Sequence, residues 1–236
     1  MRRIVLVLAL LLWPALAFAL PVDLELILAV DVSRSIDQEE AKLQREGYIA
    51  ALTHPRVIQA IRSGPQRRIA LSYVEWAGVD FQQTLIGWSL IEDEGSARAF
   101  ASKLAEAPIV ARNWTSISGA IDYAARLFGT SGYEGTRRVI DISGDGRNNS
   151  GRPSDDARDE ALAAGITING LPIINDRPNF GMPPERDLDL FYRDHVIGGP
   201  GAFLIVAEDF SSFANAILNK LIREIASDFS DVLAAR

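Results

Sequence analysis

The sequence predicts a single α/β domain built on a doubly wound, mostly parallel sheet of six strands, one of them an antiparallel edge strand. Short apolar runs alternate along the chain with segments of helical spacing, which is typical of a parallel sheet covered by helices on both faces. The first run, Leu24 to Val30, is apolar except for Glu25, as expected for a strand buried on both faces. One link between two strands is too short for a crossover, so those two strands are expected to be antiparallel.

Six segments have the composition of strands. A turn at Gly78-Val79-Asp80 separates the second from the third, so these two are expected to form a hairpin. Pro172 has no amide hydrogen to donate to a ladder, so the fifth strand should end there or lie near an edge. The strands are expected at residues 24–30, 68–76, 81–91, 138–143, 166–171 and 202–206.

Apolar residues recur between the strands at the spacing of helices. The first helix is expected to place Leu43, Tyr48 and Leu52 on one side, and Gly165 to end another helix. The last helix is the longest, with an apolar face that runs from Phe210 to Phe229. The helices are expected at residues 37–52, 55–61, 96–104, 116–128, 154–164 and 210 to about 233.

The N-terminus has the pattern of a signal peptide, residues 1–19. Two arginines precede an apolar run from Ile4 to Leu12, and Ala17-Phe18-Ala19 has the small residues that signal peptidase recognises. The run is shorter than the roughly 20 apolar residues that span a bilayer. We expect cleavage after Ala19, with Ala17 as a second possible position. The alternative is an uncleaved N-terminal anchor.

The composition of the remaining domain, residues 20–236, limits the classes of partner that it can bind. The chain carries a net charge of −7, and loss of Arg2 and Arg3 with the signal peptide makes it two units more negative. This balance argues against nucleic acid and anionic membrane surfaces as partners. The absence of cysteine excludes disulfides and thiolate metal sites. No later stretch is long and apolar enough to insert stably in a membrane, so the domain is expected to be periplasmic or secreted.

Polar residues follow the first strand in the pattern Asp31-Val32-Ser33-Arg34-Ser35. Alternate residues of an extended segment project to one side, so Asp31, Ser33 and Ser35 can converge on one point. Thr115 precedes a helix, and Asp145 follows the fourth strand. Ligands of doubly wound sheets bind outside the carboxyl ends of the strands, where these five side chains are expected to lie. Oxygen ligands suit Mg²⁺, Mn²⁺ or Ca²⁺ rather than zinc or copper.

These pieces, in this order, resemble the metal-ion-dependent adhesion site of von Willebrand factor type A domains, which occur in integrins and many bacterial surface proteins. The pattern of strands and helices is similar from about Leu24 to the C-terminus. The segment from Tyr192 to Phe203, YRDHVIGGPGAF, further resembles a family of exported bacterial proteins of unknown function that carry this domain. The resemblance implies a Rossmann-like sheet with a divalent cation, Mg²⁺ above all, at its top.

The resemblance also assigns roles to the five residues. Ser33, Ser35 and Thr115 would bind the metal directly, and two aspartates, Asp31 and Asp145, would bind it directly or through water. One position departs from the family, because type A domains usually have a threonine where this chain has Gly144. Different hydrogen bonds and a slightly shifted Asp145 are therefore expected.

The implied function is a non-catalytic binding module that docks an Asp or Glu of a protein partner on the metal. Neutral hydroxyl ligands leave the cation electrophilic, with an open position for a carboxylate. One alternative is a metal-dependent hydrolase, for example a phosphoesterase, that uses Asp31 and Asp145. A second is a type A fold whose metal site has lapsed, and in the plainest interpretation Asp31 only caps a helix. His54 and His195 stand in no recognisable catalytic setting, which weakens a serine-hydrolase interpretation.

Other features have two interpretations each. Asp141, inside a buried strand, is expected to hydrogen-bond to a neighbouring loop, or else to orient a loop that carries metal ligands. Asn148 and Asn149 are interpreted as turn formers rather than ligands. Trp114 is either a rim contact or a core anchor. The Pro-rich segment 175–186 either forms a lip for the partner or is a surface insertion.

Overall fold

The computed structural model describes residues 19–174, 185–210 and 212–226. Within them the chain forms one five-stranded sheet, in which the first, second, fourth and fifth strands pair in parallel and the third is antiparallel. The strands are β1 (Leu20–Asp31), β2 (Ile69–Trp76), β3 (Gln82–Ile91), β4 (Tyr133–Gly144) and β5 (Thr167–Pro172). Their order across the sheet is β3-β2-β1-β4-β5. The predicted hairpin of β2 and β3 is confirmed, and β3 is the antiparallel edge strand.

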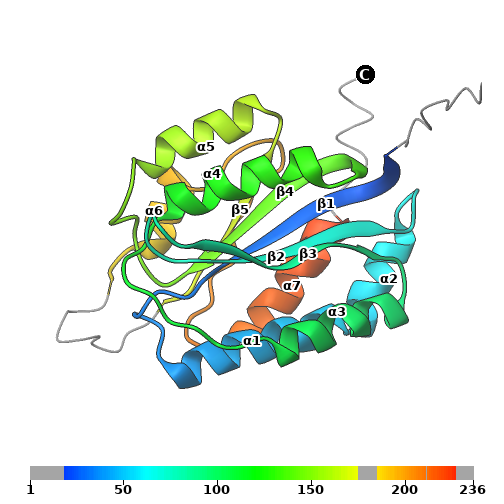
Figure 1. The fold of residues 1–236 in the computed structure, drawn as a ribbon, viewed down its shortest axis with the longest axis horizontal. Coiled ribbons are helices and arrows are strands. Elements are labelled where there is room, and N and C mark those ends of the chain that lie inside the picture. The colour runs from blue at the N-terminus through cyan, green and yellow to red at the C-terminus, as the bar shows by residue number, and fades with distance from the viewer. Residues whose placement is uncertain (1–18, 175–184, 211, 227–236) are drawn as a thin grey trace, which may run out of the picture.

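Helices cover both faces of the sheet (Figure 1). One layer contains α1 (Gln38–Leu52), α2 (Pro55–Ser63), α3 (Glu94–Glu106) and α7 (Phe213–Ala226). The other contains α4 (Ile117–Leu127), α5 (Ser154–Ala163) and α6 (Leu188–His195), with a short 3-10 helix, η1 (Phe128–Thr130), directly after α4. The doubly wound, mostly parallel fold predicted from the sequence is therefore confirmed.

β1 lies in the middle of the sheet, between β2 and β4. Every residue of β1 from Val22 onward is buried, because helices cover both of its faces. Leu26 and Leu28 pack toward the layer of α1 and α7, whereas Ile27 packs toward the layer of α4 and α5. Glu25, a charged residue within this buried stretch, is buried as well and accepts a hydrogen bond from the backbone N–H of Gly135 at 2.8 Å.

α1 begins where Asp37 and Glu40 form a capping box. The Asp37 side chain accepts from the N–H of Glu40, and the Glu40 side chain accepts from the N–H of Asp37, both at 2.8 Å. Leu43, expected on the buried side of this helix, is 39% exposed. It lies five residues before Tyr48, which is roughly 140° around a helix of 3.6 residues per turn, so the two cannot share one face.

The expectation of a sixth strand at residues 202–206 is wrong. This segment runs beside β5, which ends at Pro172 as expected, but pairs with the sheet only at isolated positions. The backbone N–H of Phe203 donates to the side chain of Asn169 at 2.9 Å, where a strand would bond to backbone. Gly201 precedes it with a φ of +69°, which bends the chain out of the extended conformation.

Some predictions fall on residues outside the described ranges. They are residues 1–18 of the signal peptide, most of the Pro-rich segment, and the continuation of the last helix beyond Ala226. Among the described residues, no helix combines the length and the apolar character needed to cross a membrane.

Candidate metal site

The carboxyl ends of β1 and β4 lie side by side, because the two strands are parallel neighbours with Val30 opposite Ser143. β1 ends at Asp31, and β4 ends one residue before Asp145. The two aspartates that the sequence assigns to a metal site therefore leave the sheet at the same edge. Asp31 is completely buried and Asp145 is nearly so.

Ser33 and Ser35 connect these two aspartates. The backbone N–H of Ser33 donates to Oδ1 of Asp31 at 2.7 Å, and its hydroxyl lies 2.7 Å from the hydroxyl of Ser35. The Ser35 hydroxyl in turn donates to Oδ1 of Asp145 at 2.5 Å. Four of the five predicted residues thus form one continuous chain of contacts.

Thr115 is held at this edge by backbone contacts with the two neighbouring loops. The N–H of Arg112 donates to the carbonyl of Val32 at 2.9 Å, which ties the loop before α4 to the loop after β1. The N–H of Thr115 donates to the side chain of Asn149, and its carbonyl accepts from the N–H of Asn149, both at 2.8 Å. The Thr115 hydroxyl lies beside Gly146, 3.6 Å from the point where a Cβ would stand. All three loops are therefore tied to one another.

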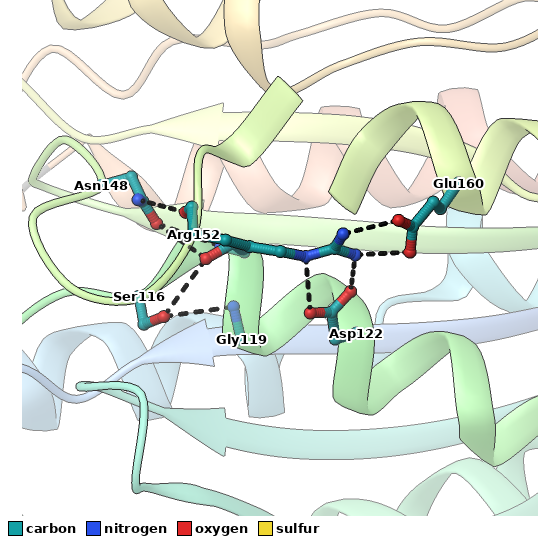
Figure 2. A network of polar contacts seen from close by, with 7 residues as sticks. Ser116, Gly119, Asp122, Asn148, Arg152 and Glu160 are labelled. Atoms are coloured by element: carbon teal, nitrogen blue, oxygen red, sulfur yellow. Dashed lines mark hydrogen bonds and ion pairs between the residues drawn. The ribbon is translucent and has the colours of Figure 1, made fainter. Parts of the chain in front are cut away.

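Asn148 and Arg152 fasten the loop after β4 to the helices behind it (Figure 2). The side-chain oxygen of Asn148 accepts from the N–H of Ser118 at 3.1 Å, and its nitrogen donates to the carbonyl of Arg152 at 3.0 Å. The Arg152 guanidinium bridges Asp122 of α4 and Glu160 of α5 at 2.6 Å. Asn148 therefore bonds to the backbone of α4 and of its own loop, while the side chain of Asn149 bonds to the backbone of Thr115.

The contacts around Gly144 explain why this position has no side chain. A Cβ on Gly144 would lie 2.8 Å from Oδ2 of Asp31, closer than real Cβ atoms approach, and a tight 3.0 Å from the hydroxyl of Tyr192. Tyr192 belongs to α6 and is completely buried, and the sequence analysis assigned it no role. The signal that could have found it is the departure itself, since a missing side chain indicates that another group fills the space.

The pKa shifts at this edge of the sheet indicate buried groups with excess negative charge. Burial raises the pKa of Asp31 well above its ordinary value, and the negative charge of Asp145 raises it further, against the opposing hydrogen bond from Ser33. Burial also raises the pKa of the Tyr192 hydroxyl, followed by the charges of the same two aspartates. These shifts are those expected of a poorly solvated site with surplus negative charge, which a bound cation would relieve.

The donor groups fit a hard divalent cation. They comprise two carboxylates and three hydroxyls, and Mg²⁺ and Ca²⁺ prefer oxygen ligands. Oδ2 of Asp31 is a buried acceptor that has no hydrogen-bond partner among the described residues. In the described part of the chain, no three His, Cys, Asp or Glu side chains gather into a metal-binding group. A cation at this edge would therefore depend on the serine and threonine hydroxyls as well as the carboxylates.

Asp141 does not bond to a loop, and the sequence-based expectation for its partner is wrong. Nζ of Lys220, on α7, lies 2.9 Å from Oδ1 of Asp141 and 2.7 Å from Oε1 of Glu224. All three side chains are completely buried. Asn169 of β5 donates to the same oxygen of Glu224 at 3.0 Å. Asp141 thus joins the sheet to α7 through a buried ionic group.

Trp114 is a surface residue rather than a core anchor. Its side chain is 66% exposed, and its φ of +67° lies in the left-handed region that non-glycine residues rarely adopt. A Cβ on Gly78 would lie 3.1 Å from the Cβ of Trp114, which places the β2–β3 turn against it. Val79 in that turn is 56% exposed. The two most exposed large apolar side chains of the described residues therefore lie on adjoining loops beside Thr115.

Both histidines are engaged away from these five residues. Nδ1 of His54 accepts from the N–H of Arg56 and caps α2. His195 ends α6, where its Nδ1 lies 3.0 Å from a carboxylate oxygen of Asp155. The serine hydroxyls of the site have carboxylate and hydroxyl neighbours instead.

A family model described as protein of unknown function (DUF1194) matches residues 21–229. A comparison with curated proteins gives no match. Among solved structures, the chain is similar to proximal thread matrix protein 1 from the mussel byssus, in a structure described as having a zinc-occupied MIDAS motif. The identity is 13% and the TM-score 0.61, over 88% of this chain and 49% of that one.

Two bacterial structures are similar as well. One is a von Willebrand factor type A from Catenulispora acidiphila, with 14% identity and a TM-score of 0.58 over 87% of this chain and 42% of that one. The other is the pilus adhesin SpaC from Lactobacillus rhamnosus GG, with 13% identity and a TM-score of 0.64 over 89% and 31%. The chain spans about half or less of each of these three structures. At such identities the likeness shows the fold, which is that of a von Willebrand factor type A domain.

Proposed function

Because the chain belongs to the family described as protein of unknown function (DUF1194) and has a von Willebrand factor type A-like fold, we propose that it is an exported, non-catalytic binding module. A divalent cation, Mg²⁺ above all, binds at the edge where β1 and β4 end. There it receives an acidic side chain of a protein partner. The residues that hold the cation are Asp31, Ser33, Ser35, Thr115 and Asp145.

The proposal is carried by the chain of contacts from Ser33 through Ser35 to Asp145, with Asp31 held beside it. Oxygen atoms from two loops far apart in the sequence already lie within hydrogen-bond distance of one another. A hard cation needs such a cluster of oxygens, and small rotations of the hydroxyls are enough to turn their lone pairs toward one ion. Thr115 completes the set from a third loop that is tied to both others.

The bound metal supplies positive charge and a coordination position for a further anion. Two carboxylates only just balance a divalent charge, and neutral hydroxyls leave the metal electrophilic, so a carboxylate from outside can fill the open coordination position. A charge-assisted contact of this kind, partly withdrawn from water, can anchor an interface. Trp114 and Val79, exposed on the adjoining loops, add apolar area next to it.

Docking is favoured over catalysis by the chemistry of the neighbours. Metal-dependent hydrolysis requires a base or nucleophile next to the ion, and the two histidines of the chain have their partners elsewhere. The adhesin and the matrix protein with the zinc-occupied motif share this fold, which supports a binding role here. Export follows from the signal peptide proposed for residues 1–19, which directs the domain to the periplasm or the medium.

The metal is tested by titrating the purified domain with Mg²⁺ and Mn²⁺ in a calorimeter. We expect saturable binding by the wild type and a loss of at least 100-fold in affinity for Asp145→Ala, a large loss for a principal ligand. Glu46→Gln is the matched control, because Glu46 is an exposed carboxylate on α1 paired only across the surface with Lys42. No binding by the wild type at millimolar metal would favour a lapsed site.

The partner is tested by capture from a cell-envelope extract, with magnesium and again with a chelator. Capture that depends on magnesium and is lost in Asp145→Ala supports the proposal, and capture that ignores the chelator contradicts it. Chromogenic phosphate and carboxylate esters with added metal test the alternative. Turnover by the wild type that disappears in Asp145→Ala would establish a hydrolase instead.

A further inference from the structure

Two of the buried polar atoms that lack a hydrogen-bond partner among the described residues lie around Gly144. One is Oδ2 of Asp31, whose other carboxylate oxygen accepts from the N–H of Ser33. The second is the hydroxyl of Tyr192. Buried polar groups in native proteins are nearly always paired, so two unpaired atoms in one neighbourhood require an explanation.

The two atoms border the same small space. A Cβ on Gly144 would stand 2.8 Å from Oδ2 of Asp31 and 3.0 Å from the Tyr192 hydroxyl. One atom is an acceptor, and the other carries a hydrogen that it can donate. The glycine leaves between them a gap that a modest rotation of either side chain, or a single water molecule, can close.

Glycines on two neighbouring strands, β4 and β5, leave the space in which Tyr192 lies. Its ring lies against Gly170 of β5, where a Cβ would stand 2.9 Å from the ring carbon Cδ1. Its hydroxyl reaches Gly144 at the end of β4, the strand next to β5. A side chain at either position would displace the tyrosine, so the position of Tyr192 depends on both glycines.

We propose that Tyr192 is a positioning residue, whose hydroxyl donates a hydrogen bond to Oδ2 of Asp31, directly or through one water. The Ser33 N–H holds Oδ1 and Tyr192 holds Oδ2, so the whole carboxylate is fixed in plane and direction. A carboxylate that is already fixed loses little conformational freedom when it binds the metal. Groups that hydrogen-bond to metal ligands commonly change metal affinity 10- to 100-fold. This role in metal binding rests on the proposed function.

The contact itself is tested without metal, by a double-mutant cycle of Tyr192→Phe and Asp31→Asn in chelator. Urea unfolding midpoints of the wild type, both single variants and the double variant give the coupling between the two side chains. We expect the two effects to be non-additive, because the phenol hydroxyl and the carboxylate act on one another. Additive effects overturn the proposal, whether or not the protein binds metal.

The positioning role is tested by Mg²⁺ calorimetry on Tyr192→Phe, which keeps the buried ring and removes only the hydroxyl. The expected result is a 10- to 100-fold loss of Mg²⁺ affinity, measured in a protein that still folds in chelator because the ring continues to fill its space. Tyr123→Phe is the control, because that hydroxyl bonds to Thr84 of β3.

The outcomes separate the two proposals. Equal Mg²⁺ affinity of Tyr192→Phe and the wild type overturns the positioning role and leaves the metal site intact. A wild type that binds no metal overturns the proposed function. The double-mutant cycle then still decides whether Tyr192 is the partner of Asp31.

Discussion

Nζ of Lys220 lies 2.9 Å from Oδ1 of Asp141, and both side chains are completely buried between β4 and α7. The same ammonium lies 2.7 Å from Glu224, so that one lysine serves two carboxylates. Ions in a protein interior are tolerated when they are paired and become costly when a partner is removed. The group therefore fastens the helix to the sheet and makes that attachment sensitive to charge.

Lys220→Met is expected to destabilise the fold by roughly 3–5 kcal/mol, because it leaves the buried acidic pair of Asp141 and Glu224 without its cation. The free energy of unfolding in urea measures the effect. Lys42→Met is the control, since Lys42 forms only an exposed pair with Glu46 and should cost less than about 1 kcal/mol. Similar losses for the two variants would show that the buried group contributes nothing special.

Stability should fall with rising pH in a window set by Asp141. Burial, and then the charge of Glu224, raise the pKa of Asp141 from 3.8 to about 8 against the opposing effect of Lys220. Between these values the folded chain holds a proton that the unfolded chain releases, so the free energy of unfolding decreases as pH rises. A single group contributes at most about 1.4 kcal/mol per pH unit.

Asn at position 141 has no carboxyl group to titrate. The free energy of unfolding of Asp141→Asn should therefore decrease less steeply with pH over the same window than that of the wild type. Urea unfolding at a series of pH values measures both slopes. Asp31, whose pKa is also raised, remains in both proteins and cancels in the comparison. Identical slopes would contradict the assignment of the proton to Asp141.

Asn149→Ala should weaken metal binding without touching a ligand. The Asn149 side chain accepts a hydrogen bond from the N–H of Thr115 at 2.8 Å, and its loss leaves Thr115 tied to the loop after β4 by backbone bonds alone. We expect a 10- to 100-fold loss of Mg²⁺ affinity by calorimetry, the range found for groups that orient ligands. Asn215→Ala, on the exposed side of α7, is the control and should bind like the wild type. Unchanged affinity in both would show that the backbone bonds from Asn149 and Ser150 hold Thr115 in place without the Asn149 side chain.

Trp114→Gly should separate docking from folding. Glycine adopts the positive φ of this position freely, which relieves about 1 kcal/mol, while little buried area is lost. We expect an unchanged or higher melting temperature, unchanged metal affinity and weaker magnesium-dependent capture of the partner. Leu43→Ala, an exposed apolar residue on α1, should leave capture unchanged. A lower melting temperature would mean that Trp114 is structural after all.

The fold was predictable where one physical rule dominates. β1 has an apolar run because both its faces are buried, and the β2–β3 hairpin follows from the shortness of its link. Asp31 and Asp145 could be placed at one edge because parallel strands present their carboxyl ends together. In each case the signal lies within a few residues of the feature that it predicts.

The remainder depends on pairings between distant segments. Lys220 sits in an apolar helix stripe, and nothing near it in the sequence indicates that its partner is Asp141. Residues 202–206 have the composition of a strand, yet the side chain of Asn169 takes the backbone N–H of Phe203. Tyr192 is visible only through the glycines on which it lies. The periodicity of a segment predicts which of its faces is buried. It does not predict which other segment of the chain packs against that face.

The bridge that Arg152 makes between Asp122 and Glu160 affects the rate and the affinity expected for a cation at the proposed site. It fastens the loop after β4 through groups that never meet the ion, so the loop is in place before the ion arrives. Binding then spends little conformational entropy on ordering backbone, and the cation is expected to associate in one step at a rate governed by the loss of its own water.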